Sequence, residues 1–290
     1  MSVSTSAVPL LFVDFVDDAA IFPLGDAENR PPAARQARAE AVAAHQRHRA
    51  AWYSALVGPL LLPSGVLEEL RPHLRGNLGI GLVGEVNGAG ATAGEGFELR
   101  QIETAVARRG EDPMPGVAKL LALAGALPGL AVYAEVPLAW GLLGALDVMA
   151  QARADGIQIA AKFRTGGLAA ELFPTPVELA AVICACRDRE LPFKVTAGVH
   201  RTIRQKDLET GFTHHGVVNI LAASLAAAAG AEVVTVAEWL AATDPVTLTD
   251  LIAPYRSTRR PLWTGFGSSN VAESVRDLGA LGLLTPDPSG

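Results

Sequence analysis

Short apolar runs alternate with helix-like segments throughout this 290-residue chain, and this alternation restricts the fold more than any other feature. Glycine or proline bounds most of the runs, which is typical of buried strands. Six runs cover residues 10–16, 58–65, 78–85, 97–107, 130–137 and 261–270, and two more surround Lys162 and Lys194. The sequence therefore predicts eight strands.

Helix-like segments lie between the runs. They cover residues 32–56, 66–74, 114–127, 142–153, 174–188, 217–229 and 271–281, and a helical insertion covers residues 231–260. Thr175, followed three residues later by Glu178, is typical of a helix N-terminus. Strands and helices alternating over this length predict one α/β domain over residues 1–290, a (β/α)8 TIM barrel with a helical insertion before strand eight. An open, doubly wound sheet is the alternative.

Composition narrows the class of partner and the compartment. The net charge of −6 argues against nucleic acid, which requires a basic surface. Cys184 and Cys186 lie two residues apart on a predicted helix, which favours two reduced core residues over a disulfide. The N-terminus lacks a signal-like apolar core, and the most apolar stretch, residues 217–229, is too short to span a bilayer. These features predict a cytoplasmic protein that has no membrane partner.

Charged residues recur near the carboxyl ends of the predicted strands. They are Asp14, Glu85, Glu103, Glu135, Lys162 and Lys194. In a TIM barrel these ends converge on one mouth, where catalytic groups lie. The barrel explains this recurrence better than an open sheet does.

Of these residues, the two lysines are the most costly to enclose in a barrel. Because strand side chains alternate between faces, Lys162 shares a face with Arg164, and Lys194 shares a face with Thr196. Two lysines enclosed at a similar height are costly unless they are neutralised or used in chemistry. Neutralisation by Glu103 and Glu135 in a structural ion-pair network is one interpretation. The other is a nucleophilic lysine whose pKa is lowered by burial and by a second cation.

Three motifs carry a resemblance to a known family. K-F-R-T-G-G around Lys162, F-K-V-T-A-G-V-H-R-T around Lys194 and G-F-G-S-S-N at residues 265–270 resemble the deoxyribose-phosphate aldolase group. The resemblance covers about a third of the chain and implies a class I aldolase on a (β/α)8 barrel, with no cofactor. It implies that Lys162 forms the Schiff base, that Lys194 lowers the pKa of Lys162, and that the loops at Gly198 and Ser268–Ser269 bind phosphate. Arg164 departs from the pattern, which usually has a small hydroxyl residue there.

A lyase reaction also needs groups that move protons and hold the substrate. Glu135, with Glu103, suits proton transfer in imine formation. The loops after strands seven and eight often bind anions in barrels, and backbone N–H groups at a helix N-terminus favour them. We therefore predict a small anionic carbonyl substrate. The predicted substrate-binding residues are Asp14, Arg164, Thr165, Thr196, Gly198, His200, Gly267, Ser268 and Ser269.

Two other functions fit the same residues. In the first, Glu85, Glu103 and Glu135 hold Mg²⁺ and Lys162 acts as a general base in an enolate-forming lyase or isomerase. In the second, the barrel binds a small anion without turnover. No Gly-x-Gly-x-x-Gly follows a strand, so the sequence predicts no dinucleotide cofactor. His214 and His215 lack ligands at metal-binding spacing, which favours capping and surface polarity. The alanine-rich stretch 221–229 suits close helix packing or a homo-oligomer interface.

Overall fold

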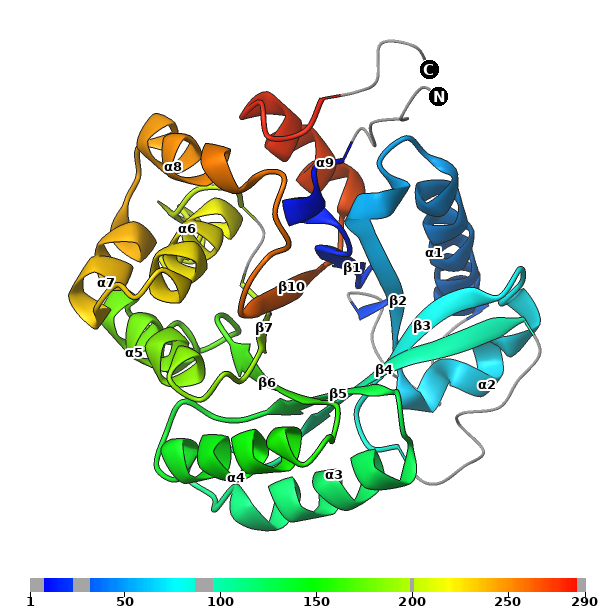
Figure 1. The fold of residues 1–290 in the computed structure, drawn as a ribbon. Helices are drawn as coiled ribbons and strands as arrows, with labels where there is room; N and C mark the ends of the chain where they lie inside the picture. Colours follow the sequence, from blue (N-terminus) through cyan, green and yellow to red (C-terminus); the bar gives the residue numbers. More distant parts are fainter. Residues whose placement is uncertain (1–7, 23–31, 87–95, 199–200, 286–290) are drawn as a thin grey trace, which may run out of the picture.

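The computed structural model describes residues 8–22, 32–86, 96–198 and 201–285. Eight parallel strands form a closed barrel in the order β1-β10-β7-β6-β5-β4-β3-β2 (Figure 1). The strands are β1 (Val16–Asp18), β2 (Val57–Pro63), β3 (Leu78–Val83), β4 (Phe97–Ala105), β5 (Ala131–Glu135), β6 (Ile159–Arg164), β7 (Phe193–Thr196) and β10 (Trp263–Ser268). The predicted TIM barrel is confirmed, and the doubly wound sheet is excluded because the first strand pairs with the last.

Helices surround the barrel on the outside (Figure 1). They are α1 (Pro32–Ala50), α2 (Leu67–Leu70), α3 (Met114–Ala126), α4 (Leu142–Ala154), α5 (Pro176–Arg187), α6 (Val217–Ala228), α7 (Val233–Ala241), α8 (Pro245–Ile252) and α9 (Val271–Ala280). Helices α7 and α8 are the predicted insertion before the last strand, and they pack on α5 and α6. The insertion thus thickens the outer layer and leaves the strand order unchanged.

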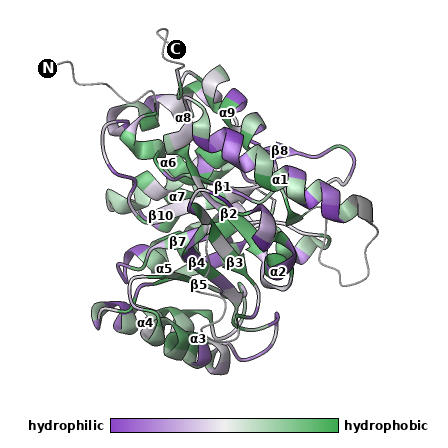
Figure 2. Cartoon of the chain, turned by 90° about the vertical axis from the view of Figure 1, so that its right-hand side faces the viewer, coloured by the Kyte–Doolittle hydropathy of each residue, from purple (hydrophilic) through white to green (hydrophobic). Residues whose placement is uncertain are grey.

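The core lies between the strands and the helices. Buried apolar side chains of the strands and helices form one large cluster, and a smaller cluster lies beneath α1 and α2. Hydrophobic colouring follows strands such as β2 and β3, whereas hydrophilic stretches are prominent on α1 (Figure 2). This division follows from burial of the apolar strand face against the helices. The other strand face is left to line the barrel interior.

Three predicted elements differ from the structure. Residues 10–12 form a 3-10 helix rather than the start of a strand, and β1 begins at Val16, after Asp14 has turned to a φ of 48°. Helix α1 ends at Ala50, and a separate 3-10 turn covers residues 54–56. The segment predicted as a helix over residues 66–74 contains only one α-helical turn, because Pro72 lacks the N–H group that would continue the α-helical pattern.

One small element has no counterpart among the predicted ones. Strands β8 (Gln205–Lys206) and β9 (Thr213–His214) pair antiparallel in the connection between β7 and α6. Two-residue strands contain too little alternation to be recognised from a sequence. The hairpin places His214 beside the loop that follows β7.

Candidate functional site

A pocket of about 310 Å³ lies at the carboxyl ends of the barrel strands. Its walls include the last residues of several strands, among them Val83 of β3, Glu135 of β5, Arg164 of β6 and Thr196 of β7. Its volume falls at the lower end of the range that small-molecule pockets occupy. The pocket therefore lies where TIM barrels bind their ligands.

Lys162 lines this pocket and is only 3 % exposed. Its Nζ donates to Oε2 of Glu103 at 2.8 Å and to Oε2 of Glu135 at 2.9 Å. The register of the sheet produces these contacts, because Lys162 pairs with Glu135 on β5 and with Lys194 on β7. One ammonium group thus lies between two carboxylates.

Lys194 is as deeply buried as Lys162. Its Nζ donates to Oε1 of Glu103 at 2.5 Å and also contacts Oδ2 of Asp17. Gln101 completes this cluster by donating from Nε2 to Asp17 at 2.8 Å and to Glu103 at 2.9 Å. The ring of Tyr133 lies 4.8 Å from the Lys194 ammonium, which is a cation–π contact. Glu103 therefore joins the two lysines.

The carboxylates control the protonation of both lysines. Burial lowers the pKa of Lys162, but Glu103 and Glu135 outweigh burial and hold that pKa above its ordinary value. The same balance raises the pKa of Lys194, with Asp17 and Glu103 as its partners. The resemblance implied that Lys194 lowers the pKa of Lys162. The pKa of Lys162 is nevertheless raised overall, because its two carboxylates outweigh the effects that lower it.

The pKa values of the three buried carboxyl groups shift in different directions. Burial raises the pKa of Glu103, but the two lysines outweigh it and lower the pKa to about 2. Lys162 and Arg164 likewise outweigh burial at Glu135 and lower its pKa. At Asp17 burial is the larger effect, and the pKa is raised. Asp17 is therefore the acid of this cluster that binds a proton most readily.

Arg164 and Thr196 lie at the pocket mouth. Arg164 is partly exposed, and its guanidinium contacts Oε1 of Glu135 at 3.0 Å. Thr196 is half-buried and lines the pocket beside Arg164. These two predicted substrate-binding residues share the pocket with Lys162.

Thr165, Gly166 and Gly198, from the two lysine motifs, lie behind the pocket wall rather than in it. The hydroxyl of Thr165 is fully buried and donates to the carbonyl of Ala197 at 2.7 Å. A Cβ atom added at Gly166 would lie 2.5 Å from Cα of Gly198, so the backbones of the two loops touch. Thr165 and Gly198 thus fasten the loop after β6 to the loop after β7. Neither lines the pocket, whereas Ala197 does.

In the loop after β10, too, some residues line the pocket and others have a structural role. Gly267 and Ser269 line the pocket. The Ser268 hydroxyl instead accepts from the backbone N–H of Asn270 at 3.1 Å and contacts the Ser274 hydroxyl at 3.2 Å. Asn270 caps α9. The N-terminus of α9 therefore lies directly after the pocket wall, as an anion site would require.

Two further predicted residues, Asp14 and Glu85, do not line this pocket. Asp14 precedes β1 and lines a cavity at the opposite end of the barrel, because strand one begins later than predicted. Glu85 lies beyond the end of β3, is exposed and pairs with Lys119 at 3.8 Å. His200 lies outside the described residues.

The magnesium alternative depends on Glu85 meeting Glu103 and Glu135. The structure does not bring the three carboxylates together, and both oxygens of Glu103 already bond to lysines. In the ranges that the structure describes, no group of three His, Cys, Asp or Glu residues has a metal-binding arrangement.

His215 is buried rather than at the surface as predicted, and it bonds to the carbonyl of Pro174 at 2.8 Å.

Sequence reasoning missed Asp17, Gln101 and Tyr133 as members of the charged cluster. Gln101 and Tyr133 carried a usable signal, since they precede Glu103 and Glu135 by two residues and therefore share their strand faces. Asp17 lay beyond the predicted end of strand one. A strand shifted by a few residues would have placed it inside the barrel.

Comparisons with protein-family models, curated proteins and solved structures found no match to this chain. No helix within the described ranges has the length and apolar character that a membrane span needs.

Proposed function

We propose that this protein is a class I aldolase-type lyase that acts on a small anionic carbonyl compound through a Schiff base on Lys162. One observation supports the proposal most. Lys162 is a buried lysine at the mouth of a TIM barrel, with Nζ bonded to two carboxylates that can exchange its protons. The resemblance of the motifs around Lys162 and Lys194 to the deoxyribose-phosphate aldolase group agrees with this assignment.

The chemistry begins with the ammonium form. Lys162 passes a proton to Glu135, and the free amine attacks the carbonyl carbon of the substrate. The carbonyl oxygen leaves as water after taking two protons, and one proton stays on nitrogen in the iminium ion. Glu135 and Glu103 are within 3 Å of Nζ and return the protons that this step needs. The iminium then accepts the electron pair of the bond between Cα and Cβ and becomes an enamine as that bond breaks. At the same time the hydroxyl on Cβ loses its proton to a carboxylate of the site and becomes the carbonyl of the released fragment.

The pocket also suits the proposed class of substrate. Arg164 supplies a partly exposed cation at the rim, although Glu135 shares it. The start of α9 and the backbone at Gly267 and Ser269 provide the other wall. A pocket of about 310 Å³ admits a compound the size of a small phosphorylated or carboxylated sugar derivative. The two buried, unpaired cysteines lead us to propose a cytoplasmic location.

A barrel that binds a small anion without turnover is the second candidate. The raised pKa of both lysines favours it, because a protonated amine is not a nucleophile. Three carboxylates, at Asp17, Glu103 and Glu135, face three cations, at Lys162, Lys194 and Arg164. Such a balanced network can be structural.

Borohydride trapping separates the two candidates. The protein is mixed with small aldehydes, ketones and 2-oxo acids, reduced, and weighed intact. The chain has four lysines, Lys119, Lys162, Lys194 and Lys206, so an adduct can be mapped unambiguously. The lyase proposal expects an adduct on Lys162 that disappears in Lys162→Ala and persists in Lys119→Ala, a surface control. Ligand binding by calorimetry without any adduct would instead establish the binding barrel.

A further inference from the structure

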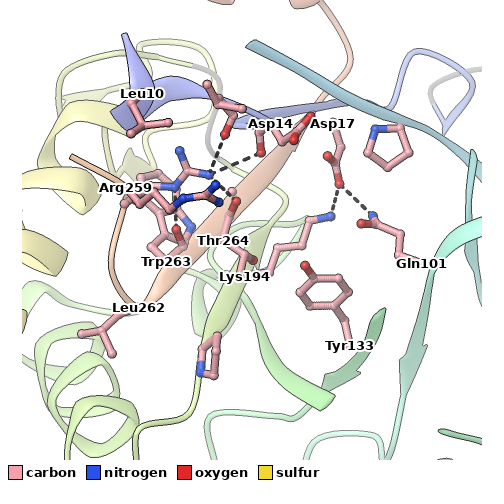
Figure 3. Close-up of a pocket in the computed structure, with 15 residues that line it drawn as sticks. Leu10, Asp14, Asp17, Gln101, Tyr133, Lys194, Arg259, Leu262, Trp263 and Thr264 are labelled. Atoms are coloured by element: carbon pink, nitrogen blue, oxygen red, sulfur yellow. Dashed lines mark hydrogen bonds and ion pairs between the residues drawn. The ribbon is translucent and has the colours of Figure 1, made fainter. Parts of the chain in front are cut away.

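A second cavity, of about 410 Å³, lies at the amino-terminal end of the barrel (Figure 3). Its rim comes from residues that precede strands, including Asp14 before β1, Pro192 before β7 and Leu262 before β10. Leu10 is 42 % exposed and Arg259 is exposed, so the cavity opens to solvent. The same cavity is lined by the buried residues Asp17 and Lys194, so it leads from the surface toward the barrel interior.

Buried charges lie at the inner end of this cavity. Lys194 and Gln101 both point at Asp17 there, and Tyr133 lies beside them (Figure 3). The two lysines consequently line different cavities, since Lys194 lines the amino-terminal one and Lys162 lines the carboxyl-terminal one. Glu103 lies between them and bonds to both.

These contacts form one continuous chain of titratable groups along the barrel. It runs from Asp17 to Lys194, then to Glu103, to Lys162 and to Glu135. Each neighbouring pair is within hydrogen-bond distance. A change in protonation at one end therefore alters the charge that the next group experiences.

The barrel makes specific room for Asp17. A Cβ atom added at Gly58 on β2 would lie 2.0 Å from Oδ1 of Asp17. The charged and titratable groups that face Asp17 come from several elements: Lys194 from β7, Glu103 from β4, Tyr133 from β5, Asp14 from the segment before β1 and Arg260 from the segment before β10. Burial raises the pKa of Asp17, so this carboxyl is the acid in the chain most readily protonated.

We infer that Asp17 is a positioning residue that exchanges protons with solvent through the amino-terminal cavity and, through Lys194 and Glu103, sets the protonation of Lys162. Once Lys162 has given up a proton, Glu103 passes it a proton taken from Lys194, and the Lys194 amine is then reprotonated by the proton that entered on Asp17. The inner groups end as they began, and one proton is available at the opposite pocket. Use of that proton in imine chemistry rests on the proposed function, whereas the coupling of Asp17 to Lys162 does not.

Competitive acylation tests the coupling without any substrate. The protein is treated with trace acetic anhydride at a series of pH values, and the rate at each lysine is measured by mass spectrometry. Removal of the negative charge in Asp17→Asn lowers the pKa of both lysines, so acylation at fixed pH should accelerate most at Lys194 and about 3-fold or more at Lys162. The surface lysines Lys119 and Lys206 are internal controls and should not change. An unchanged rate at Lys162 would overturn the inference.

Three further variants keep the test decisive. Gly58→Ala retains Asp17 but displaces its carboxylate, so it should accelerate acylation of Lys162 as Asp17→Asn does. Gly65→Ala is the control, because an added Cβ there meets nothing within 4 Å, and it should leave the acylation rate of Lys162 unchanged. Leu10→Cys coupled to a bulky maleimide should slow acylation of Lys194 at least 3-fold and leave Lys162 unaffected. Equal slowing at both lysines would contradict access from opposite ends. Borohydride trapping of wild-type protein is run alongside, so failure of the lyase proposal is seen separately.

Discussion

At the scale of single residues, Glu103 has the most consequential position in this protein. It is 1 % exposed, and its two oxygens bond to different lysines. Removal of one partner from a buried ionic network costs more than the network contributes to stability, because a charge is left buried and unpaired. The arrangement makes Glu103 the residue whose ionisation matters most to folding.

The pH dependence of stability should reveal this role. The pKa of Glu103 is about 2 in the folded protein and near 4.5 when unfolded. Because the folded value is depressed, Glu103 contributes stability above pH 4.5, and this contribution, about 3 kcal/mol at most, is lost as pH falls toward 2. Urea unfolding of wild-type protein between pH 7 and 2.5 should show this decline.

Glu103→Gln is the matched variant for this pH dependence. It should cost about 3–5 kcal/mol at pH 7, because two buried ammonium groups lose their shared carboxylate. It should also flatten the decline below pH 4.5, leaving a smaller slope from Glu135, whose pKa is also lowered. Equal acid slopes for the two proteins would show that Glu103 is not the source.

At the scale of elements, the motif glycines have a structural explanation. Gly166 follows β6, and Gly198 follows β7 with a φ of 73°. An added Cβ at either position would lie about 2.5 Å from backbone atoms of the other loop. These glycines therefore permit the close approach of two loops that frame the pocket. Neither glycine lines the carboxyl-terminal pocket.

Gly166→Ala should separate the loops and disturb the pocket. We expect a loss of about 2 kcal/mol or more in unfolding free energy, because the added methyl group meets backbone that cannot rotate away. Gly144→Ala is the matched control in α4, where nothing lies within 4 Å, and it should be neutral or stabilising by about 0.5–1 kcal/mol. Thermal unfolding of both variants measures the difference, and similar melting temperatures would contradict the close-contact explanation.

At the scale of the whole molecule, the barrel closes where β1 meets β10. Arg260 strengthens this closure by donating to the carbonyls of Leu11, Val13, Asp14, Trp263 and Thr264. Its guanidinium also lies 4.5 Å from the ring of Phe15. One side chain thus joins the segment before the first strand to the last strand.

Arg260→Met should weaken this closure. The variant keeps much of the apolar stem but leaves several partly buried carbonyls without donors, so we expect a loss of about 2–4 kcal/mol. Arg259→Met, at the neighbouring exposed position, should change stability by less than about 0.5 kcal/mol. Urea midpoints measure both effects. Equal stability of the two variants would show that Arg260 is dispensable for closure.

Much of the architecture follows from local sequence patterns. The alternation of strands and helices predicted the barrel, and the period of two along each strand predicted that Lys162 shares its inner face with Arg164. These patterns involve residues close together in the sequence, so they can be recognised without knowledge of the fold. The start of β1 was predicted wrongly because the apolar residues Leu11 and Phe12 are buried in a 3-10 turn, which hydropathy does not distinguish from a strand.

The sequence by itself determined the barrel and the two inward-facing lysines, whereas the tertiary structure alone decided what those lysines contact. Asp17 and Lys194 are 177 residues apart, and Gln101 lies 84 residues from Asp17. Their meeting depends on barrel closure and on strand register, which are set by packing of the whole molecule. For the same reason, only the folded chain shows that Lys162 and Lys194 open onto opposite ends of the barrel.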